Sequence, residues 1–134
     1  IFGRASDPIV LDQYDQIAAD LNTTALDRRD PGWLNNILRA FAVHPDYATH
    51  TATDSLVDWL AHHQTPRDDW GPEIPFYQVL NALAHLETDV ANRQCERAFD
   101  CLVQRQASDG GWGKTDRQWK TFLAVHALRN KALI

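Results

Sequence analysis

The chain has 134 residues, of which 44% are hydrophobic and 23% charged, and a formal net charge of −5. This composition is typical of a folded domain with a hydrophobic core, and the negative charge argues against nucleic-acid binding. No apolar run reaches the roughly 20 residues of a membrane span, so we do not expect a transmembrane chain.

Six helices and no strand are predicted in chain order. Apolar residues recur at helical spacing in each, and the first two open on Asp7-Pro8 and Asp30-Pro31, a capping aspartate followed by a first-turn proline. The predicted helices cover about residues 7–21, 30–43, 53–63, 75–86, 89–105 and 117–130. Because the connections are short, neighbouring helices should form antiparallel hairpins.

The second half of the chain contains an internal repeat. A shift of 42 residues places "LAHHQTPRDDWG" on "LVQRQASDGGWG", so that Gln64 falls on Gln106 and Trp70 on Trp112. The helices that follow also match, with a loop three residues longer in the second copy, and "NNILRAFAV" is a third version of that helix. We interpret "DPGW", residues 30–33, as a shortened version of the loop. Three successive hairpins predict an all-α helical-repeat domain spanning residues 1–134.

The recurring residues of the loop have structural explanations. A glutamine at a helix end can bond free carbonyls or the backbone of the next repeat, and glycines such as Gly110 supply left-handed turns. A tryptophan in such a loop should cover the joint between repeats. We therefore interpret Gln64, Trp70, Gln106, Gly110 and Trp112 as a structural repeat motif.

"RAFDCLVQRQASDGGWG" resembles the QW motif of squalene–hopene and oxidosqualene cyclases. Arg97, Leu102, Gln106, Gly110 and Trp112 fall in register with that motif, and Ala98 replaces its glycine. "KTFLAVHAL" is similar to the helix that follows such loops in protein prenyltransferase β subunits. The resemblance covers roughly residues 33–130.

The resemblance implies an α/α toroid, in which two rings of helices surround an apolar cavity. Inner helices would start near Trp33, Phe76 and Trp119, so these residues would approach a ligand. A closed toroid needs about twice as many hairpins, so the chain resembles a partial toroid. The sequence also lacks methionine and begins with Ile1, which a translated chain does not, so we expect it to be part of a longer protein.

The chemistry of these families is absent from the sequence. There is no Asp-x-Asp-Asp acid motif and no Asp-Asp-x-x-Asp magnesium motif. Asp100, Cys101 and His126 supply the residue types of a prenyltransferase zinc site, but Asp100 and Cys101 are adjacent on one helix and point about 100° apart. We expect no metal, no cofactor and no cyclase activity from this chain alone.

Basic residues surround the start of the sixth helix. Lys114, Arg117 and Lys120 accompany Trp119 there, and a helix N-terminus with cations can hold an anion such as diphosphate. A solvated basic face is the other explanation.

The cysteines, Cys95 and Cys101, are interpreted as buried thiols of a reducing compartment, which indicates a cytoplasmic location.

Two functions stay open at this level. The chain is part of a terpene-cyclase-like or prenyltransferase-like domain that binds an isoprenoid or another apolar molecule, or it is a non-catalytic module that binds a protein. The sixth helix is apolar on more than one side, which predicts a homodimer through Trp119 or Phe122, or a contact with the missing part of the parent protein. The alternative is a compact monomer whose first helix folds back over that end.

Overall fold

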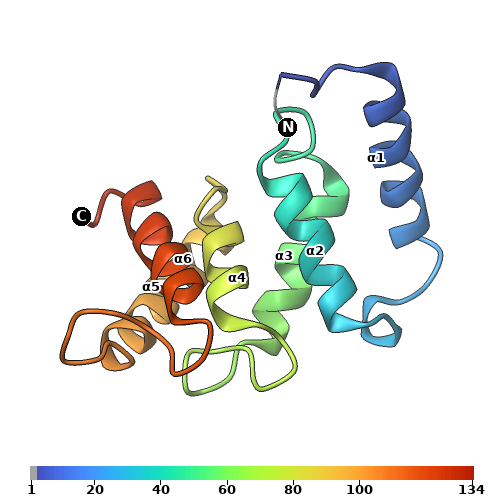
Figure 1. The fold of residues 1–134 in the computed structure, drawn as a ribbon. Coiled ribbons are helices and arrows are strands. Elements are labelled where there is room, and N and C mark those ends of the chain that lie inside the picture. The colour runs from blue at the N-terminus through green and yellow to red at the C-terminus, as the bar shows by residue number, and fades with distance from the viewer. Residues whose placement is uncertain (1–2) are drawn as a thin grey trace.

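The computed structural model describes residues 3–134, and this part of the chain is all-helical, as predicted. Six α-helices and one 3₁₀ turn follow one another (Figure 1). They are α1 (Pro8–Leu21), η1 (Leu26–Arg28), α2 (Pro31–Ala42), α3 (Thr51–His63), α4 (Phe76–Leu83), α5 (Asp89–Gln104) and α6 (Arg117–Asn130). Within residues 3–134, none of these helices is long and apolar enough to cross a bilayer.

Side-chain caps fix most helix starts. The carboxylate of Asp7 accepts a hydrogen bond from Ile9 N at 3.0 Å, and that of Asp30 accepts from Trp33 N at 2.7 Å, as the Asp-Pro pairs predict. The predicted start of α3 is wrong by two residues, because the His50 ring nitrogen caps it by accepting from Ala52 N. Helix α4 ends at Leu83 rather than near residue 86.

The helices form two layers. Helix α4 packs between α2 and α6, and α3 packs against α5, while α3 and α5 also contact α2 and α4 respectively. Thus α2, α4 and α6 form one layer, with α3 and α5 behind it (Figure 1). Each step along the chain therefore adds one helix to each layer, which is how a helical repeat buries a continuous core.

Helix α1 covers the end of the array opposite to α6 (Figure 1). The Tyr14 ring stacks on Phe41 with centroids 5.3 Å apart, and its hydroxyl donates to Ala40 O. The Tyr47 hydroxyl, whose pKa burial and Asp15 raise to about 12, bonds the Asp15 carboxylate of α1. The alternative in which the first helix folds back over the sixth is therefore wrong, because these aromatic contacts hold α1 beside α2.

The two copies of the Gln-to-Trp loop share one backbone geometry. Thr65 N donates to Asp69 O at 2.7 Å, and in the second copy Ala107 N donates to Gly111 O at 2.9 Å. Both loops also contain a left-handed residue at the same place: Asp68 has φ +62° where its counterpart Gly110 has φ +85°. The repeat read from the sequence is therefore a repeat of structure.

The interpretation of residues 30–33 as a third, shortened copy of the loop is wrong. "DPGW" forms the capped first turn of α2, so Trp33 lies in a helix and is half-buried, whereas Trp70 and Trp112 lie in loops. The cause is the Asp30-Pro31 pair, which starts the helix before the tryptophan is reached.

Candidate ligand-binding site

A pocket of about 360 Å³ lies between segment 71–78, which leads into α4, and the N-terminal end of α6. Phe76 and Trp119, two of the three aromatic residues expected to approach a ligand, line it together with Lys120 of the expected anion site. The third aromatic residue, Trp33, does not line it; the Arg29 guanidinium lies 5.1 Å from its ring centroid instead. The volume falls in the range of about 300–1,000 Å³ typical of small-molecule sites.

Phe76 forms a fixed, buried wall of this pocket. Its ring lies 5.8 Å from the ring of Trp70 and 5.3 Å from that of Tyr77, in an edge-on arrangement. The Arg105 guanidinium lies 4.3 Å from the Phe76 centroid, a cation–π contact. Aromatic neighbours on two sides and a cation on its ring hold Phe76 in one position before any ligand arrives.

Asp69 in turn holds Arg105. Its carboxylate accepts from Arg105 Nη2 at 2.5 Å, from the Thr65 hydroxyl at 2.8 Å and from Gly71 N at 3.1 Å. Burial alone would raise the pKa of Asp69, but these donors and the charge of Arg105 lower it below its ordinary value. The loop that precedes α4 is therefore tied to α5 by an ionised, hydrogen-bonded carboxylate.

The charges that line the pocket balance. Among its lining residues only Lys120 and Asp116 are charged, with opposite signs. Lys120 Nζ donates to the Thr115 hydroxyl at 3.0 Å. Arg117 is not available for the predicted anion site, because its guanidinium bonds the Asp109 carboxylate and Gly113 O. The pocket therefore has no net charge among its lining residues that would pair with a diphosphate.

Sequence reasoning missed the polar residues of this pocket. Tyr77, Gln78 and Asp116 line it beside the expected aromatic residues. The Gln78 Oε1 accepts from Asn35 Nδ2 at 2.7 Å, which links the pocket wall to α2. In the sequence, Tyr77 and Gln78 directly follow Phe76, which is the one hint that they could lie near the same pocket. That hint is weak, because adjacent residues of a helix do not share a face.

The zinc-type residues do not come together. Within residues 3–134 no three His, Cys, Asp or Glu side chains lie close enough to hold a metal ion. Cys95 and Cys101 are buried free thiols, as predicted, and burial raises the pKa of Cys95 to about 12. The Nδ1 atom of His126 lies 2.9 Å from Asn81 Nδ2, and its ring stacks on Phe122. His126 is therefore part of the contact between α4 and α6.

The first copy of the predicted repeat motif occupies a joint between two hairpins, and the second copy lies within its own hairpin. Trp70 and Trp112 are only 3% and 5% exposed, which confirms that both tryptophans are buried. The Gln64 side chain donates from Nε2 to Gln94 O at 3.1 Å, a bond to the backbone of the next hairpin's helix. Gln106 instead donates to Gly110 O at 2.8 Å within its own loop.

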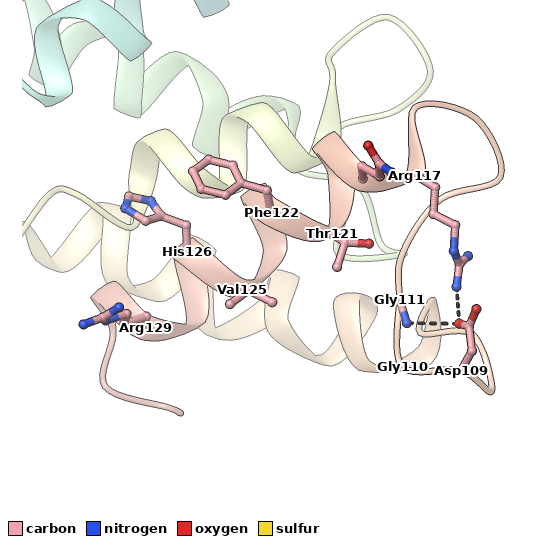
Figure 2. A pocket seen from close by; sticks show the side chains of 10 residues that line it. Asp109, Gly110, Gly111, Arg117, Thr121, Phe122, Val125, His126 and Arg129 are labelled. Atoms are coloured by element: carbon pink, nitrogen blue, oxygen red, sulfur yellow. Dashed lines mark hydrogen bonds and ion pairs between the residues drawn. The ribbon is translucent and has the colours of Figure 1, made fainter.

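A second, open hollow of about 730 Å³ lies on a side of α6 that no other helix of residues 3–134 covers (Figure 2). Phe122, Val125 and His126 line its middle. Figure 2 shows the Asp109–Arg117 pair at one end and Arg129 at the other. This hollow is a surface feature distinct from the pocket at Phe76.

Known proteins give no further guidance to either site. No family model, no curated protein and no solved structure matches this chain.

Proposed function

We propose that this chain is a terpene-cyclase-like or prenyltransferase-like α/α-repeat domain that binds an uncharged isoprenoid, or another apolar molecule, in the pocket between Phe76 and Trp119. The observation that carries the proposal is that Phe76, Trp119 and Lys120 line one pocket at the N-terminal ends of two helices of the same layer. Apolar walls with a few polar groups are typical of sites that bury an apolar ligand.

The polar groups of the pocket give the ligand an orientation. Tyr77 and Gln78 lie on the α4 side, and Asp116 and Lys120 lie on the α6 side. A terminal hydroxyl can bond any of these groups, and the hydrocarbon then lies along Phe76 and Trp119. The charges of Asp116 and Lys120 offset one another, so the pocket offers no net positive charge to a diphosphate. Because burying an unpaired charge is costly, we expect weaker binding of the diphosphate than of the alcohol.

Isothermal titration with geranylgeraniol and with geranylgeranyl diphosphate tests this function. We expect saturable binding of the alcohol, weakened at least tenfold by Trp119→Ala. Phe122→Ala is the matched control, because Phe122 stacks on Trp119 but does not line the pocket. Equal effects of the two substitutions, or tighter binding of the diphosphate, would contradict the proposal.

We also propose that this chain has no cyclase activity of its own. The proposal rests on the sequence, which lacks the Asp-x-Asp-Asp acid needed to protonate an alkene or epoxide. Incubation with squalene, oxidosqualene and geranylgeranyl diphosphate should return starting material only. A cyclised product above a heat-killed control would refute this.

Protein binding is the second candidate function, and one observation favours it. Trp119, Phe122 and Val125 are 45%, 54% and 40% exposed on one helix. Contiguous exposed apolar side chains mark interaction surfaces in folded proteins.

A further inference from the structure

The exposed face of α6 corresponds, in the internal repeat, to the face of α4 that contacts α6. Helix α4 contacts α6 through Asn81, whose Nδ2 donates to Leu123 O at 3.3 Å and lies 2.9 Å from His126 Nδ1. A shift of 45 residues matches α4 to α6 and places Asn81 on His126 and Tyr77 on Phe122. Phe122, the copy of Tyr77, is thus exposed on the outer side of α6, whereas Tyr77 itself lies in the pocket between α4 and α6. His126, the copy of Asn81, contacts α4.

The two Gln-to-Trp loops differ in the same way in the layer of α3 and α5. Across the first joint, Gln64 Nε2 bonds Gln94 O and Trp70 Nε1 bonds Gln94 Oε1 at 3.3 Å, so both residues reach the following helix α5. Their copies stay within their own hairpin: Gln106 is exposed and bonds Gly110 O, and Trp112 Nε1 bonds Leu102 O at 2.8 Å. The second joint has the same glutamine and tryptophan as the first, but no helix of residues 3–134 lies on its far side.

The opposite end of the array does not match this face. The solvent side of α1 carries Asp12, Gln13, Gln16 and Asp20, all exposed, together with one exposed apolar residue, Ile9. Such a polar helix is typical of a cap that ends a repeat array. A second copy stacked head to tail would therefore bury polar and charged groups of α1 against Phe122 and Val125, which is unfavourable.

We propose that the outer face of α6 and the loop 106–113 form an open repeat joint that binds a further helical hairpin of the same type. One helix of that hairpin packs on Phe122 and Val125, continuing the layer of α2, α4 and α6. The other continues the layer of α3 and α5 and brings a side-chain amide, like that of Gln94, to the exposed Gln106. This inference does not depend on ligand binding at Phe76, because Phe122 and Val125 do not line that pocket.

A chain in which residues 84–128 are duplicated in tandem tests the proposal. The duplication continues the register of 45 residues, so Leu128 is followed by Ala84 just as Leu83 is in the natural chain. We expect one cooperative urea transition, with the folded-to-unfolded ratio at least tenfold above that of the natural chain. Two separate transitions, or no gain, would overturn the proposal.

The same substitution placed in either copy provides the control. Phe122→Asp in the first copy lies at the new joint and should lower the folded-to-unfolded ratio at least tenfold. In the second copy it lies on the free end and should change that ratio less than twofold. Equal effects of the substitution in the two copies would overturn the proposal. Loss of geranylgeraniol binding with these results intact would refute only the ligand proposal.

Discussion

The indole Nε1 of Trp70 donates to Oε1 of Gln94 at 3.3 Å, across the joint between the first loop and the next hairpin. Gln94 is only 3% exposed, and its Nε2 donates to Val57 O at 3.0 Å and to Val90 O at 3.3 Å. One buried amide therefore joins the loop, α3 and α5. A buried amide with all of these partners fixes one arrangement of the helices, because any shift would leave a polar group unpaired.

Gln94→Leu should lower the free energy of unfolding by about 1–3 kcal/mol, because Val57 O and Trp70 Nε1 lose their partners in a buried place. Urea denaturation followed by circular dichroism measures this loss. Gln104→Leu, at an exposed position of the same helix, should change stability by less than about 0.5 kcal/mol. Equal effects at the two positions would contradict a role for Gln94 in the joint.

Trp112→Ala should cost about 3–5 kcal/mol, as expected for a buried aromatic side chain that leaves a cavity. The same denaturation experiment applies. Trp119→Ala is the comparison, because Trp119 is half exposed and should cost clearly less. A loss below about 1 kcal/mol for Trp112→Ala would mean that this tryptophan does not stabilise the joint.

Gly110→Ala should destabilise the chain by about 1–2 kcal/mol through backbone strain alone. Gly110 has φ +85°, and the nearest atom to an added Cβ is Gln106 Nε2 at 4.0 Å, so there is no clash. Gly110→Asn should cost less, because asparagine tolerates the left-handed region, as Asp68 does in the first loop. Thermal unfolding would separate the two, and equal losses would argue for a clash instead.

Stability should fall as the pH drops from about 7 to about 5, partly through His85. Burial, followed by the charges of His126 and Lys131, lowers the pKa of His85 below 6.5. The unfolded chain therefore binds the proton more readily, and the contribution is present above that value and is lost as the pH falls. His85→Gln should flatten this part of the pH profile, measured as urea midpoints, and an unchanged slope would exclude His85 as a cause.

The isolated natural chain should form a homodimer at micromolar concentration, because Phe122 and its neighbours on α6 lack a cover. Sedimentation equilibrium measures the association. Phe122→Asp should give a monomer, whereas Val103→Asp, on an exposed part of α5, should leave the dimer intact. A natural chain of monomer mass at every concentration would show that the open face does not bind a second copy.

The sequence by itself determined the elements and the repeat. Apolar spacing predicted the helices, Asp-Pro pairs marked the starts of α1 and α2, and the Gln-to-Trp spacing predicted two related loops whose tryptophans are indeed buried. These features are local, because a cap, a turn or an amphipathic stripe depends on residues a few positions apart. The same local reasoning failed at "DPGW", because these four residues fit both the start of a helix and the loop motif.

Only the tertiary structure decided what lies across each joint and which faces stay open. Gln94 and Gln104 are both glutamines of one helix, yet one is buried against Trp70 and the other exposed, since only the position of α3 and its loop distinguishes them. The same holds for Phe76 and Trp33, of which only the first lines the pocket. Burial depends on contacts between residues distant in the chain, and a single helix's pattern does not contain them.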